Sequence, residues 1–156
     1  KTFFMAEKID IISTNRKALF NYEVIEKFEA GMILKGSEVK SLREKKITIN
    51  ESFVSIKSFR VFLMNAHISE YSHTGFSGHD PLRVRELLLN KKEIIKLQNS
   101  VMQKGLTIIP LKAYFKGGKA KIEIALGRGK KNFQKKESLK NKDLEREASR
   151  ELKRRR

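Results

Sequence analysis

The fold is decided by residues 106–126, which read LTIIPLKAYFKGGKAKIEIAL. Two segments rich in aliphatic and aromatic residues flank the pair Gly117-Gly118. Because glycine accepts the positive φ angles of a tight turn, this arrangement predicts a β-hairpin. In the second strand, Lys119 and Lys121 have the same parity, so we expect both side chains on one face. The hairpin favours a sheet as the basis of the fold.

Further strands are expected before this hairpin. Residues 22–28 alternate in places between apolar and polar side chains, and 32–34 form a second short apolar run. Residues 53–64 are rich in Phe, Val and Ile and predict one or two strands with a turn near Ser58. Residues 66–71 are expected to continue the sheet.

Two helices are expected between the early strands and the hairpin. Ser37 is a candidate N-cap for a short helix that reaches Arg43. Asp80 suits an N-cap and Pro81 suits the first helical position, so we expect a second helix that contains the leucines at 87–89.

A third helical segment follows directly. Asn90 and Glu93 have the spacing of a capping box, and Gly105 is a typical helix end. Five or six curved strands with a few helices suit a small barrel. We therefore expect a mainly β fold, a small oligonucleotide-binding-like β-barrel with about three helices and a basic C-terminal tail.

Charge is the strongest compositional signal. The 156 residues include 35 Lys and Arg against 18 Asp and Glu, which gives a net charge of +17 and a pI near 10.2. A surplus of this size usually exists because a polyanion neutralises it, and RNA, DNA and anionic membranes are the candidates. No apolar run approaches the roughly 18 residues of a spanning helix, so the membrane is the weakest of the three.

The charge is unevenly distributed, and this divides the chain. Residues 127–156 are predicted to be a basic tail with too few apolar side chains to order alone. Residues 12–126 are the expected RNA-binding β-barrel body, and residues 1–11 are an N-terminal extension. We expect Met5 to be the natural start and residues 1–4 to have been added in cloning.

The tail nevertheless has a helical rhythm. Leu144, Ala148 and Leu152 lie four residues apart and form a narrow apolar stripe, with charges on the other sides. An isolated helix of this length is marginal in water. We expect the tail to be disordered when free and helical on its target.

No pattern indicates an enzyme. The histidines at 67, 73 and 79 do not match common zinc spacings, and neither a nucleophile elbow nor a Walker loop occurs. The segment 127–131, GRGKK, is interpreted as a flexible basic hinge. The absence of cysteine fits a reducing cytoplasm. The sequence predicts no catalytic residue, no metal site and no cofactor.

Two short segments have open interpretations. Arg16 and Lys17, after Asn15, are either solvated charges or phosphate contacts. Glu29, beside Gly31, is either part of a surface salt bridge or an acceptor for base or ribose donors.

Four motifs carry a family resemblance. The first is NRKA at 15–18, and the second combines FEAG at 28–31 with Leu34, Gly36 and EVKSLR at 38–43. The third is HDPLRVRELLL at 79–89, and the fourth is GRGKK at 127–131. In this order they resemble the small protein B family, the partner of transfer-messenger RNA in bacterial ribosome rescue.

The resemblance implies a cytoplasmic, non-enzymatic RNA-binding factor. It would bind the tRNA-like domain of transfer-messenger RNA, while its tail enters the empty mRNA channel and decoding centre of a stalled ribosome. It would thereby license entry of the charged RNA that elongation factor Tu delivers. The expected RNA contacts are Asn15, Arg16, Lys17, Glu29, Leu88 and Lys121; the expected contacts with small-subunit ribosomal RNA are Arg128, Lys130, Lys131, Phe133, Lys135 and Lys136.

The chain departs from the family pattern at two places. In the segment 133–136, Gln134 stands where the family usually has Asp and Lys136 where it usually has Arg, and Glu86 stands where a basic residue is common. The alternatives are a basic ribosomal protein or a general RNA-binding module. A metal-dependent nuclease is disfavoured because no carboxylate or histidine cluster is recognisable.

Overall fold

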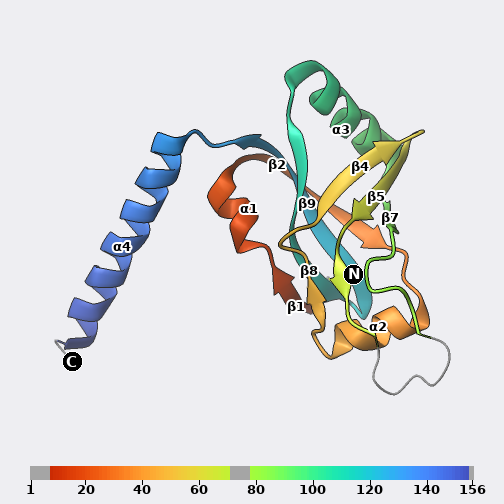
Figure 1. Cartoon of the computed structure of the whole chain (residues 1–156), viewed down its shortest axis with the longest axis horizontal. Helices are drawn as coiled ribbons and strands as arrows, with labels where there is room; N and C mark the ends of the chain where they lie inside the picture. Colours follow the sequence, from red (N-terminus) through yellow and green to blue (C-terminus); the bar gives the residue numbers. More distant parts are fainter. Residues whose placement is uncertain (1–7, 71–77, 155–156) are drawn as a thin grey trace, which may run out of the picture.

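The computed structural model describes residues 8–70 and 78–154. Its largest element is a seven-stranded antiparallel sheet with the order β1-β8-β9-β2-β7-β5-β4 (Figure 1). The expected start at Met5 and residues 1–4 lie outside the described part of the chain. The strands of this sheet are β1 (Ile9–Thr14), β2 (Tyr22–Met32), β4 (Phe53–Lys57), β5 (Arg60–Met64), β7 (Arg85–Leu88), β8 (Thr107–Lys116) and β9 (Lys119–Gly129).

The predicted hairpin is confirmed as β8 and β9, which lie between β1 and β2 in the sheet. Gly117 and Gly118 form its turn with φ angles of 57° and 77°. On its other side β9 pairs with β2 over most of the length of both strands. The extended run predicted at 22–28 belongs to β2, which ends at Met32, so residues 33–34 of the second predicted run lie outside the strand.

The central strands have two different faces. The inner face carries the main core, with residues such as Phe28, Ala30 and Ile122 almost fully buried. One end of the outer face is covered by α1 (Arg16–Asn21), a short helix that the sequence analysis missed. The second, smaller core under α1 consists of Ala18, Ile109, Leu111 and Ala125.

The sheet curls so that its two halves approach each other. The turn predicted near Ser58 is confirmed between β4 and β5, and both Ser58 and Phe59 have positive φ angles. β4 also contacts β8. Within the described residues, however, no hydrogen-bonded ladder joins these strands. The mainly β class is therefore confirmed, whereas closure into a barrel is not shown.

The helix predicted from Asp80 through the leucines at 87–89 is wrong. Arg85 and Leu87 are buried while Glu86 and Leu88 face outward, which is the period-two pattern of strand β7. The alternation was hidden because one of its buried members is an arginine. Asp80 instead accepts a hydrogen bond from the backbone N–H of Leu82 (3.0 Å).

The other predicted helices are present. In α3 (Lys91–Lys104), the N–H of Asn90 donates to the Glu93 carboxylate (3.2 Å), and Gly105 ends the helix with φ 63°, as predicted. Helix α2 (Gly36–Arg43) begins before Ser37, so Ser37 is not its N-cap.

Two segments differ from their predicted places. Residues of the 66–71 run form β6 (His67–Ile68), which pairs with β3 (Ile47–Thr48) in a separate two-stranded sheet. β9 runs beyond Leu126, where we expected the body to end, and β1 includes part of the expected N-terminal extension.

Helix α4 (Asn132–Arg154) leaves the sheet after β9 and stands apart from it (Figure 1). It contacts the body at α1. Within the described residues, none of the helices combines the length and the apolar composition that crossing a bilayer requires.

A buried ionic network holds α2 against β7. The side chains of Glu38 and Arg85 are both 0% exposed, and Arg85 Nε donates to Glu38 Oε2 at 2.6 Å. Arg83 binds the other carboxylate oxygen at 2.5 Å. Arg85 also donates to the carbonyls of Ala66 and Pro81. Burial alone would raise the pKa of Glu38, but the surrounding donors, with Arg83 first, outweigh burial and hold the pKa below its usual value.

We predict that Glu38→Ala destabilises the protein far more than Glu86→Ala. The first change leaves the buried Arg85 without its partner, which should lower the free energy of unfolding by about 3–5 kcal/mol. The control removes a carboxylate from a solvent-screened pair with Arg60 (2.8 Å), which should cost far less stability. Urea unfolding followed by circular dichroism measures both values, and equal losses would contradict the role of the buried network.

Candidate nucleic-acid interface

Three predicted or motif residues form a row on the outer face of the sheet. Leu88 on β7 and Lys121 on β9 are both Cα partners of Gly31 on β2. Leu88 is 57% exposed. A Cβ added to Gly31 would lie 3.5 Å from Leu88 Cβ and 3.6 Å from Lys121 Nζ, so the lysine ammonium lies over the glycine. The row therefore presents an apolar side chain and a cation side by side over the glycine.

Glu29 lies two residues before Gly31 on the same face of β2 and has a fixed position. The Tyr114 hydroxyl donates to its Oε2 at 2.5 Å, and Lys116 Nζ lies 3.3 Å from the same oxygen. The hydrogen bond from Tyr114 is the main reason that the pKa of Glu29 is lowered, with Lys116 and Lys121 contributing. The carboxylate is therefore an oriented acceptor, and the interpretation as a salt bridge holds only for its contact with Lys116.

Tyr114 supports this arrangement from β8. Burial first, and then the neighbouring Glu29 carboxylate, raise the pKa of Tyr114 well above its usual value. The phenol therefore stays protonated and can donate to Glu29. Tyr114 was not predicted as a site residue, although the two-glycine turn sets the hairpin register and places Tyr114 opposite Lys121.

Asn15 is reassigned by the structure. Its side chain is 2% exposed, and all of its polar atoms are used within the protein. Oδ1 accepts a hydrogen bond from Ala18 N–H (3.0 Å), and Nδ2 donates to the carbonyls of Pro110 (2.9 Å) and Ile49 (3.3 Å). Asn15 therefore caps α1 and anchors it to the sheet, and its side chain is not presented as a contact for RNA.

The two basic residues after Asn15 are exposed on α1. Lys17 forms a surface pair with Glu51 at 2.7 Å, with both side chains more than half exposed. Arg16 lines a hollow of about 410 Å³ between α1 and α4, together with Phe20, Lys130 and Lys142. Of the two, Arg16 is the better placed for a phosphate contact.

Of the segment 127–131, which was interpreted as a flexible hinge, residues 127–129 belong to strand β9. Gly127 pairs with Val24 in the ladder between β9 and β2. A Cβ added there would lie only 3.1 Å from Ile109 Cδ1, so the glycine serves close packing. The Lys130 N–H and Nζ donate to the carbonyls of Asn21 (2.8 Å) and Leu19 (3.3 Å) at the end of α1.

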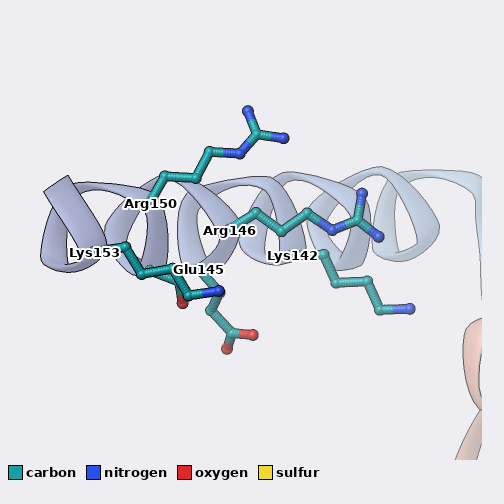
Figure 2. Close-up of a pocket in the computed structure, with 6 residues that line it drawn as sticks. Lys142, Glu145, Arg146, Arg150 and Lys153 are labelled. Carbon is teal, nitrogen blue, oxygen red and sulfur yellow. The ribbon is translucent and has the colours of Figure 1, made fainter.

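The predicted tail residues lie along the end of β9 and the start of α4. Arg128, Lys131 and Lys136 are exposed, and Lys130 and Lys135 are partly buried. The side chain of Phe133 lies outside what the structure describes. Farther along α4, a second set of basic residues that the sequence analysis did not single out lines one side of the helix (Figure 2); these are Lys142, Arg146, Arg150 and Lys153. Their spacing of three or four residues was visible in the sequence.

His79, one of the histidines tested as a metal ligand, has a structural position. It is 3% exposed, with Nδ1 2.9 Å from Ser37 Oγ and Nε2 2.9 Å from the carbonyl oxygen of Ile68. Both ring nitrogens are therefore occupied by contacts that join α2 to β6.

Known proteins resemble this chain over most of its length. The family model described as SmpB protein matches residues 12–154. The SsrA-binding protein of Sulfurihydrogenibium sp. (strain YO3AOP1) is 50% identical over 149 residues, which cover 96% of this chain and 97% of that protein. The SsrA-binding protein of Aquifex aeolicus (strain VF5) is 48% identical over 149 residues, or 95% of each chain.

A solved structure has the same fold. It is described as "tmRNA-SmpB: a journey to the center of the bacterial ribosome" and matches with a TM-score of 0.65 and 42% identity. The match covers 81% of this chain and 93% of that chain.

We predict that Tyr114→Phe raises the pKa of Glu29 toward its ordinary value, because the phenol donor is lost. The stabilisation that Glu29 contributes is present above its unfolded-state pKa and disappears as the pH falls through its lowered folded-state pKa, so the variant should lose stability mainly at neutral pH. Carboxyl ¹³C NMR titration measures the change. Glu86, whose pKa is lowered by Arg60, is the internal control and should not respond.

Proposed function

This chain belongs to the SmpB protein family, and from that premise we propose that it binds the tRNA-like domain of transfer-messenger RNA and acts in the rescue of stalled ribosomes. The match over residues 12–154 confirms the family resemblance found in the sequence motifs. The observation that carries the proposal for this chain is the row of Leu88, Gly31 and Lys121 beside the oriented carboxylate of Glu29.

Each residue of the row offers a different contact to RNA. The ammonium of Lys121 is suited to a phosphate, and the exposed Leu88 is suited to the apolar face of a ribose or base. Glu29 accepts hydrogen bonds only, so its partners are base N–H groups or a ribose 2′-hydroxyl. A carboxylate near phosphates costs repulsion unless its geometry is specific, and Tyr114 supplies that geometry.

The α1 region extends this face. Arg16 is exposed and suited to phosphate, and Lys17 can exchange its surface pair with Glu51 for an RNA contact at little cost. Asn15 acts indirectly by holding α1 in place.

The tail is proposed to bind small-subunit ribosomal RNA in the decoding centre and the empty mRNA channel. Its described side chains in α4 are exposed, Lys135 excepted, so little tertiary packing supports the helix. We propose that it orders on ribosomal RNA and licenses entry of the charged RNA that elongation factor Tu delivers in the cytoplasm. The contacts would be made by Arg128, Lys130, Lys131, Phe133, Lys135 and Lys136.

Lys121→Ala should weaken binding to the tRNA-like fragment of transfer-messenger RNA about five- to tenfold, because one phosphate contact is lost. The slope of log K against log salt should fall by about one. Lys57→Ala, at the end of the edge strand β4, removes an equal charge outside this face and should change neither quantity. Fluorescence anisotropy at several salt concentrations measures the affinity and the salt slope. Identical results for the two variants would contradict the assignment of Lys121 to the RNA-binding site.

Deletion of residues 132–156 should leave the affinity for the tRNA-like fragment within about twofold and abolish tagging on stalled ribosomes. The deletion leaves β9 and the Lys130 contacts with α1 in place, so the folded body should keep its melting temperature. A reconstituted translation assay with a truncated message measures tagging. Loss of RNA affinity in the truncated protein would contradict the proposal that the body alone binds the tRNA-like fragment.

A further inference from the structure

A hollow lies beside the row of Leu88, Gly31 and Lys121, at the α2 end of the sheet. It has a volume of about 290 Å³. Its apolar lining includes Leu34, Val39 from α2 and Phe115 from β8. The three residues of the row also line it, so the hollow is continuous with the proposed RNA face.

We propose that this hollow receives one unstacked nucleobase of the bound RNA, an inference that rests on the proposed function. Sequence-specific RNA recognition mostly uses bases splayed out of loops, whose faces pack against aromatic and apolar side chains. The hollow offers such a surface, because Leu34, Val39 and Phe115 are only half-buried and remain accessible from outside.

The charges around the hollow favour a nucleotide over an apolar peptide. Lys119 and Lys121 lie among the lining residues, and none of these residues is acidic. No ion pair involves either lysine within the described residues, so both ammonium groups are available to the phosphates that flank an inserted base.

Gly31 contributes by what it lacks. It has no side chain, so the Leu88 side chain and the Lys121 ammonium lie over its buried backbone and line the hollow together with it. The base would therefore enter the hollow beside Leu88 and Lys121, with its sugar near Leu88 and its phosphate near the two lysines. This places readout of a base next to the hydrogen-bond acceptor Glu29 on the same face.

The first test fills the hollow without changing any charge. Val39→Phe should reduce affinity for the tRNA-like fragment about tenfold and leave the salt slope unchanged, unlike Lys121→Ala. The matched control is Val101→Phe, which makes the same change on helix α3 in a separate hollow between α3, β4 and β8, and should leave affinity unchanged. Thermal unfolding establishes that both variants are folded. Unchanged affinity of a folded Val39→Phe variant would overturn the inference.

The second test changes the RNA, and its deciding measurement uses the unaltered protein. Single abasic residues are placed along the loops of the tRNA-like fragment. We expect one position at which base removal lowers the affinity of the unaltered protein about tenfold. At that position, base removal should not lower the affinity of the Val39→Phe variant any further. If no position weakens binding to the unaltered protein, the inference is overturned.

The two proposals fail in different ways. If Lys121→Ala weakens binding while base removal and Val39→Phe have no effect, the hollow is excluded as a base site and the RNA face remains. If Lys121→Ala also has no effect, the proposed face itself is overturned, and the hollow with it.

Discussion

The fold depends on a fully buried ion pair between Glu38 of α2 and Arg85 of β7. Glu38 and Arg85 are both removed from water, and each would be costly to bury without the other. Their contact joins α2 to β7, while the remaining guanidinium donors bind the carbonyls of Ala66 and Pro81. One carboxylate thus positions a helix, a strand and the loop between them, in a chain whose other acids are mostly at the surface.

This constraint also determines the shape of the proposed RNA face. β7 is a short strand at the side of β2, and its burial at Arg85 leaves Leu88 pointing outward beside Gly31. On α2, Val39 follows Glu38 directly and lines the hollow next to the same row. Glu38 and Arg85, which belong to the family motifs, therefore position the residues that would contact RNA.

Local signals predicted the central part of the fold. The glycine pair at 117–118 identified the hairpin, and the capping residues around Asn90 identified α3, because turn and capping signals both act over a few residues. The strand β7 was missed because a buried arginine has no signature in hydropathy. Asn15 was misassigned for a related reason: its partners at Ile49 and Pro110 are distant in sequence, so its burial could not be inferred.

The direction in which the tail leaves the body is set by main-chain acceptors. Lys130 donates to the carbonyl oxygens of residues 19 and 21, and a carbonyl is present whatever side chain a residue carries. Substitution of residue 19 or 21 can therefore leave these hydrogen bonds intact. Substitution of Gly127 is more restricted, because an added Cβ would lie 3.1 Å from Ile109 Cδ1. Orthologues can thus preserve a common exit geometry even where the surface of the short helix diverges in composition.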